Sequence, residues 1–516
     1  MIRVLLQEIV ETSAAIAATR SRTQKSAALA GCLERADANE IETVVSYLGG
    51  ALRQRRTGIG WRGAGAAAEP AREPSLSVTE VHQGFEAIAG LGGVGSQTTR
   101  RAAVAELFGR ATEQEQTWLR AALAGAVRQG ALDALVQEAI ALAAEVSLPA
   151  VRRAAMLCGS TVLIAAAAFD GGEPALAAIG LEVGRPVLPM LASSAPDLSA
   201  ALAKAGGGRV AIDVKLDGIR IQVHRDGDHV RIATRSLDDI TDRLPEVVAM
   251  VRDLPARRLV LDGGALALDE SGRPRPFQET ASRTARQRAS PSGPVSVTPY
   301  FFDILHLDDR DLLDVPGEER LTALAALVPG RHLVPRLITD DLGEAEEFTR
   351  RALADGHEGV VVKNLAAGYQ AGRRGSGWVK VKPVHTLDLV VLAVEWGSGR
   401  RQGWLSNIHL GARDPGSGGF VMLGKTFKGM TDEMLAWQTE RFTELATSPV
   451  DHSSYVVSVR PEQVVEIALD GVQTSSRYPG GIALRFARVV GYRDDKLAAE
   501  ADTLDQVKEM FGRPAG

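Results

Sequence analysis

Hydrophobic residues follow helical spacing in the first third of the chain. Alanine and leucine dominate up to about residue 183, and few runs there alternate like a strand. Thr112-Glu113-Gln114-Glu115 is a capping-box pattern, and the apolar residues after it recur at helical spacing from Trp118 to Val127. Ser147-Leu148-Pro149 opens a second such run, with proline in the first helical turn. We therefore expect an all-α first domain, residues 1–183.

Alternating apolar residues replace this pattern from residue 184 onward. Val210, Ile212 and Val214 alternate with polar or small residues, and the alternation resumes from Ile219 to Val223. The two runs predict strands that are separated at Asp217-Gly218. Further strand and helix signals follow up to residue 386, so the second domain, 184–386, is expected to be α+β.

The last part of the chain carries short apolar runs at regular intervals. They predict a C-terminal all-β domain, residues 387–516, of the five-stranded OB-fold barrel type, with residues 383–388 as a hinge before it. The predicted strands are 389–394, 408–412, 419–424, 455–457 and 464–468.

Composition limits the class of protein. A chain of 516 residues is too long for one core, and its 45% hydrophobic and 24% charged residues are typical of a globular protein. The net charge of -5 does not by itself indicate nucleic-acid binding, although a basic groove on such a protein still binds phosphates. No apolar run approaches the roughly 20 residues that span a membrane, so we expect a cytoplasmic protein without a membrane partner. The two cysteines, Cys32 and Cys158, form no C-x-x-C pair, which excludes a cysteine zinc module.

Lys215 is the first candidate for chemistry. It stands where a predicted strand ends, between Asp213 and Asp217 and close to Arg220, so rigid backbone can hold its amine as a nucleophile. A surface lysine beside a turn fits this short pattern as well.

Two later segments supply partners for such a lysine. Lys380 and Lys382 share one face of a predicted strand, where they are either solvated or next to Lys215. Next to Lys215, they would lower its pKa and hold a phosphate. Glu358 precedes a buried apolar run, and such a carboxylate needs a partner, for example a metal ion or a ribose hydroxyl.

The order of these segments along the chain resembles the motif set of covalent nucleotidyltransferases. Among these it is most similar to the ATP-dependent DNA ligases of the actinobacterial type, which have a helical N-terminal DNA-binding domain, and the resemblance covers nearly the whole chain. The motifs are Lys215-Leu216-Asp217-Gly218, Thr234-Arg235-Ser236, Phe301-Phe302-Asp303, Glu358 to Lys363, Trp378 to Lys382, Arg485 to Arg488 and Arg493 to Lys496.

The resemblance implies a reaction and a set of roles. Lys215 would attack ATP to form a lysine adenylate, Mg²⁺ would screen the phosphates, and AMP would pass to the 5′-phosphate of a nick in duplex DNA before the nick is sealed. The protein would act as a monomer in DNA repair, replication or recombination. The nucleotide-binding residues would be Asp213, Arg220, Arg235, Phe302, Arg374, Lys380 and Lys382, the metal ligand Glu358, and the pyrophosphate-orienting residues Arg488, Arg493, Asp495 and Lys496.

The sequence departs from the usual family pattern at three positions. Gly264 stands where the family usually has a glutamate that helps to hold the ribose and a metal, and Asp262 or Glu270 could compensate. Asp213 replaces the usual glutamate two residues before the lysine, which keeps the charge and shortens the reach. Gly491 stands where many relatives have a basic residue.

Two other functions remain open on sequence grounds. An RNA ligase or capping-type guanylyltransferase would share the lysine and the barrel, although the large helical domain favours duplex DNA. The second alternative is a catalytically weakened, ligase-derived DNA-binding protein, in which Gly264 would mark the loss of the usual glutamate. Labelling by GTP would indicate the first alternative, and the absence of any labelling would indicate the second.

Overall fold

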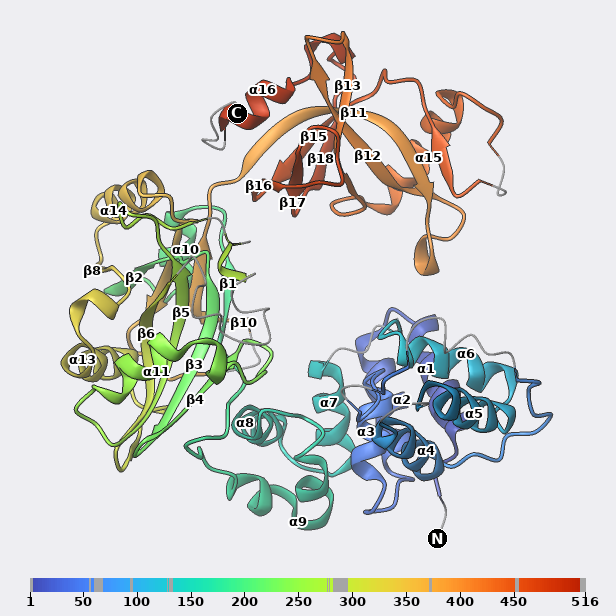
Figure 1. The fold of residues 1–516 in the computed structure, drawn as a ribbon, viewed down its shortest axis with the longest axis vertical. Helices are drawn as coiled ribbons and strands as arrows, with labels where there is room; N and C mark the ends of the chain where they lie inside the picture. The colour runs from blue at the N-terminus through green and yellow to red at the C-terminus, as the bar shows by residue number, and fades with distance from the viewer. Residues whose placement is uncertain are drawn as a thin grey trace.

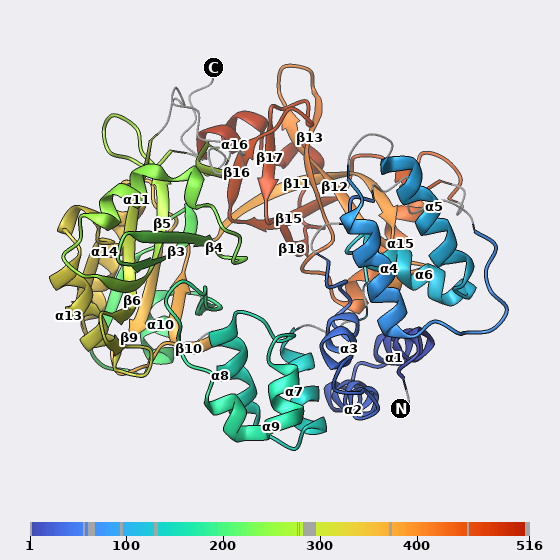
Figure 2. The ribbon, with the colours of Figure 1, turned by 60° about the horizontal axis from the view of Figure 1, so that its bottom comes forward.

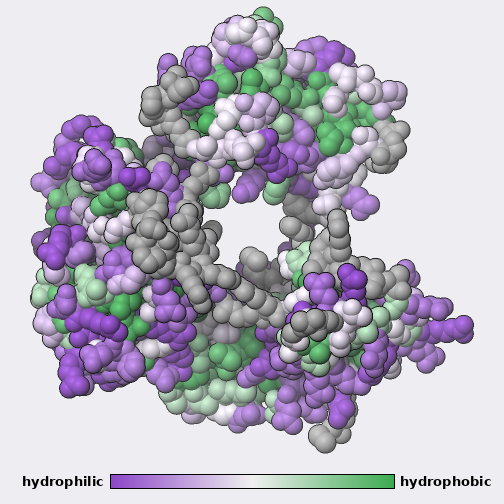
Figure 3. Space-filling view, viewed as in Figure 1, coloured by the Kyte–Doolittle hydropathy of each residue, from purple (hydrophilic) through white to green (hydrophobic). Residues whose placement is uncertain are grey.

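The computed structural model describes residues 3–54, 57–59, 68–92, 96–127, 129, 133–275, 277, 279–281, 296–370, 374–450 and 454–510. The chain forms three lobes that follow one another along the sequence and surround an open centre (Figure 1). Figure 2 shows the same three lobes after rotation. The opening between them remains visible when all atoms are drawn (Figure 3).

The first lobe is entirely helical in its described part, which confirms the predicted helical N-terminal region. The capping boxes Ser77–Glu80 and Thr112–Glu115 start α4 and α6, and Ser147 caps α8 as the sequence predicts. None of the described helices is long and apolar enough to cross a bilayer. The helices are α1 (Leu6–Ala18), α2 (Arg22–Leu33), α3 (Ile41–Leu48), α4 (Val78–Gly90), α5 (Ser96–Gly109), α6 (Glu113–Leu123), α7 (Asp133–Ala143), α8 (Leu148–Cys158) and α9 (Ala165–Ala177).

The second lobe contains two five-stranded sheets, ordered β1-β10-β9-β2-β8 and β4-β3-β5-β6-β7. Helices flank them, so the α+β prediction is confirmed. The strands are β1 (Leu191–Ser194), β2 (Val210–Val214), β3 (Ile219–Asp226), β4 (His229–Thr234), β5 (Arg258–Ala267), β6 (Val297–Leu307), β7 (Arg310–Asp311), β8 (Arg336–Thr339), β9 (Val360–Asn364) and β10 (Arg374–Val381). The helices are α10 (Leu198–Lys204), α11 (Pro245–Arg252), α13 (Gly317–Leu327) and α14 (Leu342–Ala354).

The predicted break at Asp217-Gly218 is where the chain passes from one sheet to the other. β2 belongs to the first sheet and β3 to the second, so residues 215–218 connect the two. Gly218 is closely enclosed, because an added Cβ would lie 2.4 Å from the carbonyl oxygen of Ala265. Lys215 therefore lies at the junction of the two sheets, in a segment whose two ends are fixed by β2 and β3.

The third lobe is rich in strands, but the expected closed barrel is not confirmed. Its main sheet follows an open path, β13-β12-β11-β15-β18, with β14 paired to β11 and a separate hairpin of β16 and β17. The sequence reading also missed β16 to β18 and both helices. The elements are β11 (His385–Trp396), β12 (Leu405–Asp414), β13 (Gly419–Thr426), α15 (Asp432–Glu444), β14 (Val456–Ser458), β15 (Val464–Leu469), β16 (Gly471–Thr474), β17 (Ile482–Arg485), β18 (Arg488–Tyr492) and α16 (Leu504–Met510).

Ion pairs connect the lobes. Arg153 of α8 binds Asp314 of the second lobe at 2.7 Å. Arg485 at the end of β17 binds Asp217 at 3.1 Å, and so brings the third lobe to the junction that carries Lys215. An exposed pair between Arg20 and Asp432, at 3.3 Å, links the first and third lobes directly.

Candidate active site

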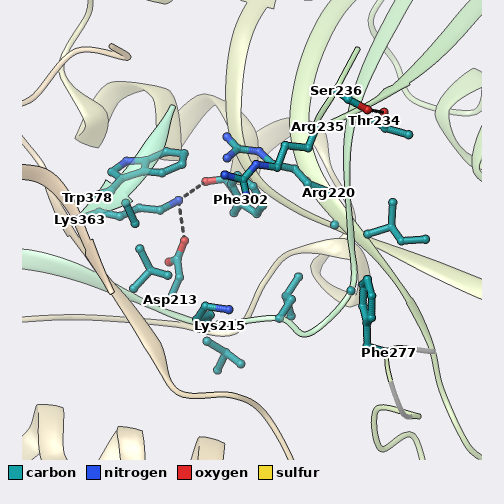
Figure 4. Close-up of a pocket in the computed structure, with 18 residues that line it drawn as sticks. Asp213, Lys215, Arg220, Thr234, Arg235, Ser236, Phe277, Phe302, Lys363 and Trp378 are labelled. Atoms are coloured by element: carbon teal, nitrogen blue, oxygen red, sulfur yellow. Dashed lines mark hydrogen bonds and ion pairs between the residues drawn. The ribbon is translucent and has the colours of Figure 1, made fainter. Parts of the chain in front are cut away.

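A pocket of about 460 Å³ lies between the two sheets of the second lobe (Figure 4). It draws side chains from both sheets and from the connection between them. Its lining includes the predicted residues Asp213, Lys215, Arg220, Arg235 and Phe302, together with Phe277, Lys363 and Trp378, to which the sequence reading gave no role.

A backbone hydrogen bond and a side-chain ion pair hold Lys215 at the pocket. Its backbone N–H donates to the carbonyl of Gly359 at 2.8 Å. Its ammonium contacts one carboxylate oxygen of Glu358, and the other oxygen accepts from Lys382 at 3.1 Å. Gly359 has φ 136°, and an added Cβ would lie 2.3 Å from the carbonyl oxygen of Val381, so only glycine fits here. The structure thus brings Lys215, Glu358 and Lys382 together as the sequence predicts.

The surroundings of Lys215 favour its neutral, nucleophilic form. Burial, followed by the positive charges of Lys382 and Lys380, lowers the pKa of Lys215 to about 7, although Asp217 and Asp470 oppose the shift. About half of the amine is then uncharged at neutral pH. Nucleophilic lysines are activated by desolvation and neighbouring cations in this way.

Two aromatic rings and two cations form another wall of the pocket. Phe302 and Trp378 meet edge to face, with ring centroids 5.7 Å apart. The Lys363 ammonium lies 4.7 and 4.4 Å from the centroids of these rings, and the Arg220 guanidinium carbon lies 5.6 Å from each. Such a wall suits a flat, electron-rich ring such as a nucleobase.

Arg220 is anchored behind this wall. Its guanidinium binds both oxygens of buried Asp262, at 3.0 and 2.5 Å, and donates to the Met190 carbonyl at 2.6 Å. The hydroxyl of Tyr369 also donates to Asp262, at 2.7 Å. Asp262 is thereby fully committed and does not line the pocket, while Glu270 is exposed and does not line it either. Neither acid therefore supplies a carboxylate to the pocket wall beside Gly264.

Asp213 lies at the base of the pocket in a buried network. Its carboxylate accepts from Arg336 at 2.5 and 2.8 Å and from Lys363 at 2.7 Å. Burial alone would raise the pKa of Asp213, but these two cations outweigh burial and hold the pKa below its ordinary value. The carboxylate is therefore ionised.

Arg235 enters the pocket from a tight turn after β4. Leu237 in this turn has φ 64°, and its N–H donates to the Thr234 carbonyl at 2.9 Å. Arg235 is exposed to solvent at the mouth of the pocket, where its guanidinium points inward beside Arg220 (Figure 4). A guanidinium in this position can bind a phosphate.

The two glycines of β5 at the pocket differ in their surroundings. An added Cβ on Gly263 would lie 2.7 Å from both Phe301 Cδ1 and the Tyr300 carbonyl oxygen. An added Cβ on Gly264 would meet only the movable end of Leu216, at 3.1 Å, and otherwise lies at ordinary contact distances. Gly263 is thus required by packing, whereas the pocket wall has room for a side chain at Gly264.

The remaining predicted residues lie outside the pocket lining. Lys380 lies near Lys215, and the side chain of Arg374 is outside the described part. In the third lobe, Asp388 binds Arg493 at 3.2 Å and Lys496 at 2.5 Å. Asp495 binds Arg493, and Arg488 lies 3.7 Å from Asp470. In this arrangement the predicted pyrophosphate-orienting cations Arg488, Arg493 and Lys496 face carboxylates of their own lobe.

A buried lysine with a pKa near 7, cations for a phosphate and an aromatic wall for a base are the parts of a covalent nucleotidyl-transfer site. Three family models match the chain in the order of its lobes. They are DNA ligase N terminus at residues 62–141, ATP dependent DNA ligase domain at 189–382, and ATP dependent DNA ligase C terminal region at 401–496.

Curated relatives match over nearly their whole length. A protein of Nocardioides sp. named Probable DNA ligase is 69% identical, over 99% of this chain and 99% of the relative. DNA ligase B of Mycobacterium tuberculosis is 56% identical, over 98% of this chain and 100% of the relative. A solved structure named Pmar-Lig_PreS3 has a TM-score of 0.61 at 17% identity, covers 94% of this chain and 99% of that chain, and supports the fold.

The chain therefore belongs to the ATP-dependent DNA ligase family. Membership confirms the predicted family and enzyme class, a DNA ligase that uses ATP.

Proposed function

We propose that the protein seals nicks in duplex DNA through an adenylate on Lys215. The observation that carries this proposal is the position of Lys215, whose pKa is lowered to about 7 and whose ammonium shares the Glu358 carboxylate with Lys382. In the first step the Lys215 nitrogen attacks the α-phosphorus of ATP and releases a proton to water. A nitrogen–phosphorus bond forms, the bond to the β-phosphate oxygen breaks, and pyrophosphate leaves.

Two further displacements complete the reaction. An oxygen of the 5′-phosphate at the nick attacks the adenylate phosphorus, which frees Lys215. The adjacent 3′-hydroxyl then attacks the 5′-phosphorus, forms the phosphodiester and releases AMP. In the first of these displacements, Lys382 and Lys380 would stabilise the charge that develops on the transferred phosphate.

The nucleotide-binding roles are part of this proposal. Phe302, with Trp378, would stack on the adenine, and Asp213 would contact the edge of the base. Arg220, Arg235 and Arg374 would bind the ribose and phosphates. The segment with Arg488, Arg493, Asp495 and Lys496 would orient the departing pyrophosphate after the third lobe moves, because arginine and lysine offer fixed positive charge to phosphates.

Glu358 is the carboxylate that would hold Mg²⁺. The described residues include no group of three or more His, Cys, Asp or Glu side chains that could hold a metal. The donor set fits Mg²⁺ nevertheless, because this ion is commonly bound by one or two carboxylates together with substrate phosphates. Bound there, it would neutralise phosphate charge.

Finer features of the organisation are proposed on the same basis. We assign residues 1–183 to DNA binding, 184–386 to adenylation and 387–516 to an OB-type domain. We further propose a monomer that works in the cytoplasm in DNA repair, replication or recombination.

Adenylate formation tests the proposal directly. Wild-type protein, Lys215→Ala and Lys215→Arg are incubated separately with α-labelled ATP, GTP or NAD and magnesium, and the label that survives denaturation is measured. Label from ATP in the wild type alone is expected, followed by sealing of a 5′-labelled nicked duplex. Label from GTP would instead favour a capping-type enzyme, and no label from any donor would refute the catalytic proposal.

A further inference from the structure

Arg336 lies one layer behind the pocket. It is the first residue of β8 and stands directly opposite Asp213 in the antiparallel pairing of β2 with β8. Asp213, Phe302 and Lys363 line the pocket, whereas Arg336 does not. Any effect of Arg336 on a bound nucleotide must therefore act through these neighbours.

One guanidinium fixes two parts of the pocket. Nε and Nη2 of Arg336 donate to Oδ1 and Oδ2 of Asp213 at 2.5 and 2.8 Å, which is the paired geometry of a strong arginine–carboxylate contact. Nη2 also donates to the carbonyl of Phe302 at 3.0 Å. The ammonium of Lys363 repeats this pattern, with 2.7 Å to Asp213 and 2.9 Å to the Phe302 carbonyl. The proposed base-edge acceptor and the proposed stacking ring are thus tied to the same two cations.

The contacts leave little acceptor capacity on Asp213. An ionised carboxylate has about four lone-pair sites. Arg336 fills two of them and Lys363 fills one, so about one site remains, and the carboxylate cannot rotate without losing a contact. Its remaining acceptor is therefore held in one direction.

We propose that Arg336 is a positioning residue that fixes the Asp213 carboxylate as an acceptor and thereby sets the preference for adenine over guanine nucleotides. The inference rests on the proposed function, in which Asp213 contacts the edge of the base. Adenine carries a donor, its amino group, at the position where guanine carries an acceptor oxygen. A carboxylate without a proton accepts from the former and repels the latter.

Loss of Arg336 would release this arrangement. Lys363 alone would then hold Asp213, so the carboxylate would turn toward the ammonium and away from its present direction. The Phe302 carbonyl would also lose a donor. A well-aligned hydrogen bond to a charged group is worth about 10- to 100-fold in binding, so loss of the contact between Asp213 and the base should weaken nucleotide binding by about that factor.

The test compares ATP with GTP in variants of Arg336. Steady-state adenylation is followed as pyrophosphate release in the presence of nicked duplex DNA, for wild type, Arg336→Ala and Arg336→Lys. For Arg336→Ala we expect KM for ATP to rise about 10- to 100-fold, kcat to change by only a few-fold, and the ATP-to-GTP preference to fall about tenfold or more, because the lost contact is made to the base and not to the reacting phosphate. Arg336→Lys should be intermediate, and low-millimolar guanidinium should restore part of the preference to Arg336→Ala.

Arg225→Met provides the matched control. Arg225 lies at the far end of β3 and donates to the carbonyls of Gly227, Val251 and Leu254, so its loss weakens the same lobe without touching the pocket. Its nucleotide preference should match the wild type. If folded Arg336→Ala keeps the wild-type KM and preference, the inference is wrong. If Arg336→Ala does not fold, an unchanged preference in Arg336→Lys refutes the inference equally.

Equilibrium binding separates this inference from the proposed reaction. ATP and GTP are titrated calorimetrically into Lys215→Ala with and without Arg336→Lys, which requires no chemistry. An ATP preference that falls with Arg336→Lys supports the inference, whether or not the wild-type protein forms an adenylate. Failure of the wild type to form an adenylate would refute only the proposed reaction. A preference that does not depend on residue 336 refutes the inference even if the reaction is confirmed.

Discussion

Replacing Lys382 with methionine should raise the pKa of Lys215. The two ammonium groups contact opposite oxygens of the Glu358 carboxylate, so we take roughly 6 Å as the separation of the two charges. At an effective dielectric constant of about 20, two charges at about 6 Å repel by about 3 kcal/mol, or about 2 pKa units. Solvent near the partly exposed Lys382 reduces this, so we expect a rise of about 1 to 2 units, from about 7 to between about 8 and 9.

A higher pKa of Lys215 shifts the pH profile of adenylation to higher pH. Only the neutral amine attacks, so adenylation rises with pH through the pKa of Lys215 and levels off above it. At pH 7 about half of the wild-type amine is neutral, against about 1 to 10% in Lys382→Met. Ionisation alone then lowers the rate at pH 7 by about 5- to 50-fold, and this part of the loss should disappear by about pH 10.

The assay is single-turnover adenylation at saturating ATP between pH 5.5 and 10. Labelling of the Lys215 amine by acetic anhydride, read by mass spectrometry over the same range, reports the pKa without ATP. Lys382→Arg is the control, because it keeps the charge and should keep a midpoint near 7. A midpoint near 7 in Lys382→Met by both methods would show that Lys382 does not set this pKa.

Further predictions concern packing in the same lobe. Gly263→Ala should lower the free energy of unfolding by about 1 to 3 kcal/mol because its Cβ would overlap Phe301, whereas Gly264→Glu should melt near the wild-type temperature, and scanning calorimetry distinguishes them. Equal melting temperatures for the two variants would contradict this account of the wall. Arg320→Met should cost about 3 to 5 kcal/mol, because it removes the direct ion-pair partner, at 2.8 Å, of the almost fully buried Asp303 carboxylate. A decrease of less than about 1 kcal/mol in the free energy of unfolding, measured by denaturant unfolding, would contradict this prediction.

The sequence predicted the position of the nucleophile because its cues are local. Alternating apolar residues on both sides of Asp217-Gly218 fix two strands, and Lys215 must then follow the end of the first. Asp226-Gly227 is an equally local turn signal, and β3 and β4 pair on its two sides. Helix starts were predictable for the same reason, since a cap and its partner lie three residues apart.

The base of the pocket could not be predicted in this way. Arg336 and Asp213 are 123 residues apart, and only the register of β2 against β8 makes them neighbours. Periodicity gives the faces of a strand but not its partner, which is also why the order and closure of the third-lobe strands were not determined. Helix α15 is capped by Thr431 but has few buried residues, so it gives no apolar run from which the sequence would predict it.

The third lobe presents carboxylates where the proposed reaction needs its cations. Asp470 lies 3.3 Å from Lys382, while Asp388 holds Arg493 and Lys496 on the lobe itself. For these cations to orient pyrophosphate, both sets of pairs must exchange for phosphate contacts. Arg493 and Lys496 keep about a third of their side chains exposed, and such pairs contribute about 1 kcal/mol or less each. The pairs therefore oppose the movement only weakly, and the short connection between β10 and β11 is the part of the chain that must rotate.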